Sequence, residues 1–254
     1  MKKPDKPVLV IIVPCFNEEE ALPETAKVLT RKIEQFISAS AVSPQSTLLF
    51  VDDGSQDATW NLIEIYHSEN PAVFCGIKLP VNTGHQNALL CGLLYIKEYA
   101  DITVTIDADL QDDVEAIDRM LDGYFSGSEI VLGVRSDRKD DGFFKRTSAV
   151  FFYGLMRFLG ADLVANHADF RLMGRESLNA LLEQGNLFLR GIVPKLGYKT
   201  GVVYYERKKR CAGKSKYTMR KMLRLAGLAF IGITRKQHHP QYHIEKTLFI
   251  TEQT

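Results

Sequence analysis

Two aspartates, Asp107 and Asp109, follow directly on a run of β-branched residues at positions 102–106. Side chains alternate along an extended backbone, so the two carboxylates can point the same way at the end of a predicted strand. Paired carboxylates are hard oxygen ligands that suit Mg²⁺ or Mn²⁺, ions whose shells are usually completed by waters and substrate phosphates. The spacing therefore predicts a divalent-metal site, with an acidic turn that caps the next helix as the alternative.

Polar clusters follow each of the five strands predicted in the first half of the chain. Continuous apolar runs alternate there with segments of helical periodicity, which favours an open, mostly parallel α/β sheet with helices on both faces. Ligands bind such sheets at the carboxyl ends of the strands. The clusters lie at 14–18, 52–55, 82–85, 107–109 and 133–135. Together they predict one binding site along a single edge of the sheet.

The pattern also predicts the bounds of the elements. Strands are expected at 8–13, 47–51, 73–79, 102–106, 130–134 and 200–205, and helices at 26–37, 59–66, 84–99, 114–125, 144–159, 175–183 and 218–233. Residues 167–171 are expected to form a polar turn that leads into a short strand. The tail from Arg235 has no clear period, which predicts poor order.

Composition and charge limit the class of protein. The chain has 254 residues, 45% of them hydrophobic, which suits one large domain with or without appendages. Residues 1–198 carry a net charge of −9, whereas residues 199–236 hold 12 lysines and arginines and one acid. Such a basic segment can face nucleic acid, anionic lipid or a phosphorylated ligand. The four cysteines are far apart and lack ligand spacing. Cys15, Cys75 and Cys91 lie in apolar contexts, which predicts buried thiols and a reducing compartment.

Neither a signal peptide nor a membrane-spanning helix is expected. The apolar run at 8–13 is short and is followed by Pro14. No stretch approaches the roughly 20 apolar residues that a spanning helix needs.

Six motifs occur in order within about residues 7–225: VPCFNEE, VDDGSQD, NTGHQNAL, DADLQDD, ADFRLM and AGKSKYT. In combination they resemble the family 2 glycosyltransferases of the GT-A fold, and more narrowly the polyprenyl-phosphate glycosyltransferases related to dolichol-phosphate mannose synthase. The resemblance implies a GT-A domain at 1–217. Residues 218–254 would form an amphipathic helix and an atypical tail, without the two transmembrane helices common in that branch.

The resemblance implies a donor site for a nucleotide sugar. Pro14, Asn17 and Glu18 would border the nucleotide. Asp52 would contact the uracil or ribose, although Asp-Gly-Ser is also good turn chemistry. The donor would be a UDP-hexose, with guanine as the other base left open.

The resemblance also assigns the metal and the sugar. Asp107 and Asp109 would hold Mg²⁺ or Mn²⁺ against the diphosphate, so that the ion neutralises charge on the departing nucleotide. Gln111 would lie near the sugar or the metal, and Asp169 beside the sugar. Related enzymes assign an acid here as the catalytic base. A lipid phosphate is largely dianionic at neutral pH and needs no proton removed, so Asp169 could instead position the donor or stabilise positive charge at C1.

The acceptor would be polyprenyl phosphate, held by cations. The resemblance implies that Arg135 and Arg146 bind its phosphate, which suits the planar guanidinium fork. A mobile lid on the diphosphate would comprise Lys214, Ser215, Lys216 and Tyr217. His85 is expected to be either simple capping polarity at a helix start or a donor contact.

The predicted reaction is an inverting hexosyl transfer to polyprenyl phosphate. One rival is a family 2 transferase with a sugar hydroxyl as acceptor, which would need a general base. Another is a non-catalytic paralogue that binds a nucleotide sugar. Nucleic acid is not an expected partner, because aromatic platforms are missing beside the basic residues.

The basic segment also predicts where the enzyme works. Residues 218–233 begin with Arg220, Lys221 and Arg224 and then turn apolar, a pattern that suits a helix lying at a membrane interface. We therefore expect a cytoplasmic enzyme, peripheral at the inner face of the membrane, with an anionic lipid surface as a partner. Homo-oligomer formation is left open.

Overall fold

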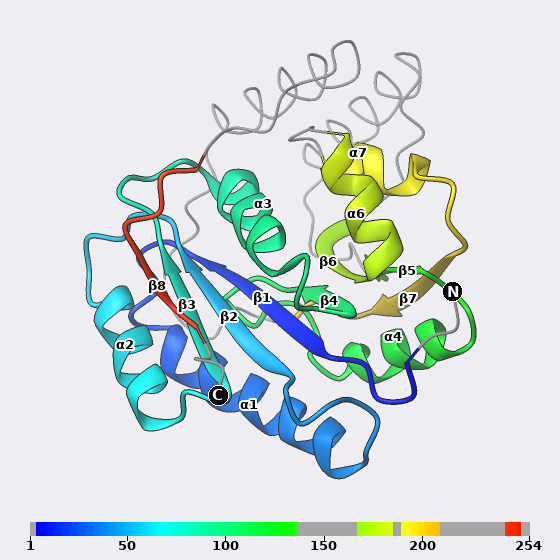
Figure 1. The fold of residues 1–254 in the computed structure, drawn as a ribbon, viewed down its shortest axis with the longest axis horizontal. Helices are drawn as coiled ribbons and strands as arrows, with labels where there is room; N and C mark the ends of the chain where they lie inside the picture. Colours follow the sequence, from blue (N-terminus) through cyan, green and yellow to red (C-terminus); the bar gives the residue numbers. More distant parts are fainter. Residues whose placement is uncertain (1–3, 137–166, 185–188, 209–241, 250–254) are drawn as a thin grey trace.

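The computed structural model describes residues 4–136, 167–184, 189–208 and 242–249 (Figure 1). They contain an eight-stranded sheet with the order β7-β5-β6-β4-β1-β2-β3-β8. The strands are β1 (Leu9–Cys15), β2 (Thr47–Asp52), β3 (Phe74–Lys78), β4 (Ile102–Thr105), β5 (Ile130–Arg135), β6 (His167–Gly174), β7 (Thr200–Tyr205) and β8 (Lys246–Leu248). Only β6 and β8 among these run antiparallel to their neighbours. The prediction of an open, mostly parallel sheet is confirmed.

Helices cover both faces of this sheet (Figure 1). One face packs against α1 (Leu22–Ser38), α2 (Thr59–Glu69) and α4 (Ala116–Phe125). The other packs against α3 (His85–Ile96), α6 (Arg175–Glu183) and α7 (Leu189–Ile192), which is followed by the 3₁₀ helix η1 (Val193–Lys195). The core therefore consists of two apolar layers with the sheet between them.

Strand β1 shows why a continuous apolar run forms a central strand. All seven of its residues are buried. Leu9 and Ile11 belong to the layer under α1, whereas Val10 and Ile12 belong to the layer under α3. Because successive side chains point to opposite faces, a strand covered on both sides needs apolar residues at every position.

Helix α3 approaches the sheet closely at a glycine. A Cβ atom at Gly92 would lie 2.9 Å from Val51 Cγ2 and 3.0 Å from Ile12 Cγ2. Both atoms belong to stiff, branched side chains, so the glycine lets the helix backbone rest on β1 and β2.

Two segments differ from expectation. Residues 167–171 are not a turn but the first part of β6. Asp169 and Arg171 lie on the same face of this strand and form an ion pair. Pairing of β6 with both β4 and β5 satisfies the backbone that we expected to be irregular. Within the tail, Lys246–Leu248 pairs with β3 as β8, a strand too short to show a period.

The predicted helices at 144–159 and 218–233 lie outside the described residues. None of the helices in the described part of the chain is long and apolar enough to cross a membrane.

The turn after β2 depends on a glycine. Gly54 has φ +69°, and a Cβ there would lie 2.5 Å from the carbonyl carbon of Val81. A side chain is therefore opposed both by the left-handed backbone and by the chain that follows β3.

We predict that Gly54→Ala lowers the free energy of unfolding by about 2 kcal/mol more than Gly197→Ala does. Gly197 is the matched control, because its φ is +77° and nothing lies within 4 Å of its Cβ position. Urea denaturation of both variants measures the difference. Equal losses would show that the close approach to Val81 costs nothing.

Candidate active site

The carboxyl ends of β1, β2, β3, β4 and β5 share one edge of the sheet, because these strands are parallel. The antiparallel strand β6 begins at this same edge: its Arg171 lies opposite Thr105 of β4. Asp169, two residues before Arg171, therefore lies beside the end of β4. The polar clusters predicted to share an edge do so, and Asp169 joins them.

Asp107 and Asp109 lie in the loop that follows β4. Asp107 has 35% of its side chain exposed, whereas Asp109 is 7% exposed. The backbone N–H of Gln111 donates to Asp109 Oδ1 at 3.1 Å. Leu110 between them has φ +52°, a left-handed conformation that costs a residue with a Cβ about 1–2 kcal/mol. The loop is therefore a tight, strained turn that holds the Asp109 carboxylate in place.

The carboxylates around Asp107 affect its ionisation. Desolvation raises the pKa of Asp107, His85 opposes this, and the negative charges of Asp112, Asp169 and Asp109 raise it further. A bound cation would relieve this crowding of like charges.

The donor chemistry of this loop fits Mg²⁺ or Mn²⁺. Among the described residues no three side chains of His, Cys, Asp or Glu are grouped to hold an ion by themselves. Asp107 and Asp109 offer hard oxygen ligands and would leave the rest of the shell to water and phosphate, as Mg²⁺ prefers.

Asp169 is buried, and residues of α3, β4 and β6 itself hold it in place. Its Oδ1 accepts from the guanidinium of Arg171, which is itself 1% exposed, and its Oδ2 accepts from Gln86 Nε2 at 3.0 Å. Thr105 donates its hydroxyl to the backbone oxygen of Asp169. The carboxylate is thus fixed in position next to Asp107.

His85, at the first turn of α3, lies between the two acids. Its Nε2 is 3.6 Å from Asp107 Oδ1 and 3.5 Å from Asp169 Oδ2. The sequence left its role open. The sequence signal that could have placed His85 in the site is its position after β3, at the edge that the other polar clusters share.

The loops after β1 and β2 are joined by hydrogen bonds. Asn17, with φ +51°, donates its backbone N–H to Ser55 Oγ at 2.9 Å and accepts from the N–H of Gln56 at 2.8 Å. The N–H of Glu18 donates to Thr59 Oγ1 at 2.8 Å. Pro14 is buried within β1 itself. These residues lie at the predicted edge, and their contact with a nucleotide stays a prediction.

Asp52 and Asp53 differ sharply although they are neighbours. Asp52 is fully buried; its Oδ1 accepts from the Ser55 N–H at 3.1 Å, which is the turn role. Its Oδ2 has no hydrogen-bond partner within the described ranges. Burial raises the pKa of Asp52 and the bonds from Ser55 oppose this.

Asp53 organises the loop before α3, a role that sequence reasoning missed. Its Oδ1 accepts from the N–H and hydroxyl of Thr83, at 2.7 Å and 2.8 Å, and its Oδ2 from the Gly84 N–H at 2.8 Å. The helix start that places His85 is therefore fixed by β2.

Arg135, at the end of β5, contacts Asp112 in the loop that follows β4. Its Nε and Nη2 lie 3.2 Å and 2.9 Å from Asp112 Oδ1, and the Tyr205 hydroxyl donates to that oxygen at 2.6 Å. Burial lowers the pKa of Arg135, but the Asp112 carboxylate and the Tyr205 oxygen more than offset it. Arg146 and residues 214–217 lie outside the described residues.

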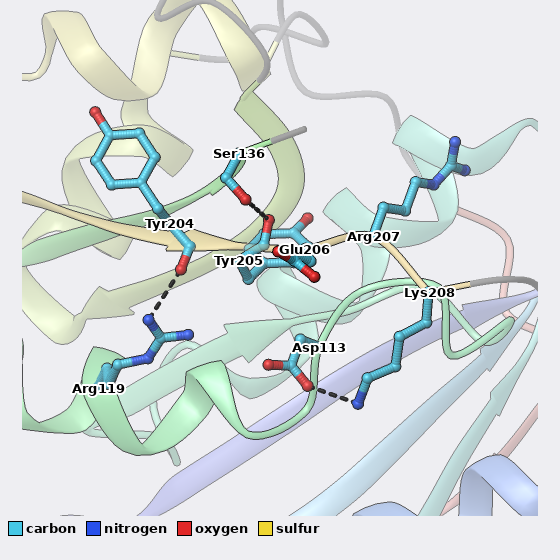
Figure 2. Close-up of a pocket in the computed structure, with 8 residues that line it drawn as sticks. All are labelled: Asp113, Arg119, Ser136, Tyr204, Tyr205, Glu206, Arg207 and Lys208. Atoms are coloured by element: carbon cyan, nitrogen blue, oxygen red, sulfur yellow. Dashed lines mark hydrogen bonds and ion pairs between the residues drawn. The ribbon is translucent and has the colours of Figure 1, made fainter. Parts of the chain in front are cut away.

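A cavity of about 430 Å³ opens beside these residues, between the loop after β4 and the ends of β5 and β7 (Figure 2). Lys208 points to Asp113, with its Nζ 2.7 Å from Asp113 Oδ1. The backbone N–H of Lys208 donates to the backbone oxygen of Gln111 at 2.8 Å. Arg207 donates to the Gln111 side chain. Gln111 is therefore held between Asp109 and the basic segment that follows β7.

Comparison with known proteins gives related sequences along most of the chain. The uncharacterized glycosyltransferase YkoT of Bacillus subtilis (strain 168) is 51% identical over 234 residues, which cover 91% of this chain and 68% of that protein. The SfII prophage-derived bactoprenol glucosyl transferase of Shigella flexneri is 36% identical over 219 residues, or 85% of this chain and 68% of that protein.

Solved structures share the fold. Glucosyl-3-phosphoglycerate synthase from Mycobacterium tuberculosis, in complex with Mn²⁺, UDP-glucose and phosphoglyceric acid, aligns with a TM-score of 0.57 at 16% identity, covering 92% of this chain and 81% of that one. The likeness shows a GT-A fold.

The sequence model of glycosyl transferase family 2 matches residues 10–182, which include β2 to β6, all of β1 except its first residue, the two loop aspartates and Asp169. With this match and relatives above 30% identity over most of their length, the chain belongs to glycosyl transferase family 2.

Proposed function

We propose that the protein transfers a hexose from a nucleotide diphosphate sugar, a UDP-sugar in the first instance, to polyprenyl phosphate, with inversion at the anomeric carbon. The observation that carries the proposal is that the loop after β4 combines acidic residues that can bind a cation with a contact to an arginine that can bind a phosphate. Asp107 and Asp109 offer oxygen ligands for a cation. The guanidinium of Arg135 contacts Asp112, which lies three residues after Asp109 in the same loop. The Shigella flexneri relative, named for bactoprenol, supports this acceptor class.

On the donor side, Asp107 and Asp109 would hold Mg²⁺ or Mn²⁺. When bound, the ion neutralises charge on the departing diphosphate. The similar Mycobacterium tuberculosis structure contains both Mn²⁺ and UDP-glucose, which supports a donor site in which a divalent ion binds together with a nucleotide sugar. Asp169, fixed by Arg171 and Gln86, would lie beside the sugar and stabilise positive charge at C1.

Asp52 supports the contact with the nucleoside. A buried carboxylate oxygen without a partner is costly, so an N–H or O–H donor supplied by a ligand would be favourable. Oδ2 of Asp52 is such an atom within the described part of the chain. Pro14, Asn17 and Glu18 would complete this side.

On the acceptor side, Arg135 would bind the phosphate, with Arg146 and the lid residues Lys214, Ser215, Lys216 and Tyr217 as further contacts proposed from sequence. A phosphate dianion is already a nucleophile and can attack C1 without a general base. A sugar hydroxyl is the less suitable acceptor, because it needs a base and Asp169 is engaged by Arg171 and Gln86.

Residues 218–233 would bring this site to the bilayer that holds the acceptor. Their basic start and apolar end are read from the sequence and suit the surface of an anionic leaflet. We propose that the protein acts at the cytoplasmic face of the membrane as a peripheral enzyme.

Transfer should require a divalent cation held by the loop after β4. Asp109→Asn removes one ligand charge and should lower kcat/KM by a factor of about 100 or more, as expected for loss of metal-based charge stabilisation. The rise in Tm that Mn²⁺ with UDP-sugar causes in the wild type should disappear in the variant.

Asp122→Asn is the matched control, since Asp122 is an exposed aspartate on α4. It should keep both the activity and the Tm shift. Full turnover of the wild type in excess EDTA would contradict the metal requirement.

The acceptor assignment predicts that purified protein forms a hexosyl lipid from polyprenyl phosphate and one member of a UDP-sugar panel. Arg135→Lys keeps the charge but loses the fork, so the KM for polyprenyl phosphate should rise about tenfold while the affinity for UDP-sugar stays unchanged.

Arg31→Lys on the exposed face of α1 is the control, with no expected change. Transfer to sugar hydroxyls alone would refute the acceptor class. Loss of donor affinity in Arg135→Lys, with an unchanged acceptor KM, would refute the role of Arg135.

Membrane association should depend on salt. Each basic residue near an anionic surface contributes about 1 kcal/mol, and salt screens this attraction. The protein should therefore co-sediment with phosphatidylglycerol vesicles at low salt and release at high salt, and Arg220→Gln with Lys221→Gln should weaken the binding. A protein that stays in the supernatant at low salt would contradict the proposal.

A further inference from the structure

We infer that Asp112 is a positioning residue that orients Arg135 toward the acceptor phosphate and ties this guanidinium to the metal-binding loop. The inference rests on the proposed function for what Arg135 binds. It assigns a role to a carboxylate that the catalytic scheme above does not use.

The contacts of Asp112 are concentrated on one oxygen. Oδ1 lies 2.9 Å from Arg135 Nη2, 3.2 Å from Arg135 Nε and 2.6 Å from the Tyr205 hydroxyl. Asp112 is 1% exposed, so these charge-assisted bonds form away from water, where they are strongest. An acid with this burial has to be compensated, and Arg135 supplies the opposite charge.

The geometry leaves part of Arg135 available for another anion. A guanidinium has five N–H donors, and Asp112 engages the side formed by Nε and Nη2. Arg135 keeps a quarter of its side chain exposed, whereas Asp112 does not. The remaining N–H groups are therefore held in a fixed direction at the carboxyl end of β5.

Tyr205 fixes this arrangement from β7. Its ring packs edge-on against Phe170, with the centroids 5.4 Å apart, and is 3% exposed. Arg135 Nε also lies 3.3 Å from the Tyr205 hydroxyl, so three side chains close a triangle of hydrogen bonds. Because Phe170 follows Asp169, the same packing connects the sugar side of the site to Arg135.

Asp112 also links Arg135 to the metal-binding carboxylates through the backbone. Only two residues separate it from Asp109, within a loop that Arg207 and Lys208 hold at Gln111 and Asp113. A shift of Asp112 would therefore move the acceptor-binding group relative to Asp109, although Asp112 itself contacts neither substrate.

The first test observes Arg135 without any substrate. In ¹H–¹⁵N spectra the Nε–H signal of Arg135, assigned by its loss in Arg135→Lys, should exchange slowly in the wild type. It should shift and exchange faster in Asp112→Asn. Asp122→Asn, an exposed aspartate on α4, is the control and should leave the signal unchanged. An unchanged Arg135 signal in Asp112→Asn would overturn the inference.

The second test is a double-mutant cycle on the KM for polyprenyl phosphate. Asp112→Asn should raise this KM about tenfold, the size of one lost charge-assisted bond, with UDP-sugar affinity unchanged. Combined with Arg135→Lys it should add little, because both changes act through one guanidinium. Effects that multiply in the double variant would overturn the inference, since Asp112 would then act independently of Arg135.

Tyr205→Phe keeps the packing against Phe170 and removes one donor to Asp112, so a smaller change of the same kind is expected in both tests. It also serves if Asp112→Asn does not fold, and a Tyr205→Phe protein identical to the wild type in both tests would overturn the inference. A wild type that ignores polyprenyl phosphate refutes the proposed acceptor, while the spectra still decide the role of Asp112.

Discussion

The arrangement of this site depends on the compensation of several acids that are crowded at one edge of a sheet. Parallel strands bring their carboxyl ends together, and here those ends are rich in aspartate. Three of the buried carboxylates are compensated by neighbouring residues. Asp53 accepts from backbone and hydroxyl donors, Asp169 pairs with Arg171, and Asp112 pairs with Arg135. Asp107 stays partly open and crowded by like charges, which a bound cation would relieve.

The insertion of β6 between β4 and β5 is the topological step that makes the site. An antiparallel strand starts where its parallel neighbours end, so β6 delivers Asp169 directly to the edge that holds Asp107. A parallel strand in the same place would have put its first residues at the opposite edge. The reversal separates β5 from β4 and leaves Arg135 across β6 from the loop after β4, and Asp112 and Tyr205 bridge this distance.

Much of this could be predicted from sequence, because its signals are local. The buried strands of the first half are apolar runs, and the polar clusters follow them directly. The start of β6 was predicted as a turn, because Asp169 and Arg171 are typical of turns until a partner across the sheet is known. The contrast between Asp52 and Asp53 and the contact of Asp112 with Tyr205, 93 positions away, depend on tertiary structure and have no local pattern.

Strand β8 has a consequence for the order of folding. The ion pair between Lys78 and Glu245 joins residues that are 167 positions apart, whereas β1 and β2 are close neighbours in the sequence. Closing so long a loop is entropically costly and yields only a three-residue strand, so β8 should add to β3 after the central strands have formed. During synthesis the edge of β3 would stay open until residues 246–248 have left the ribosome, which leaves this edge exposed to pairing with another nascent chain.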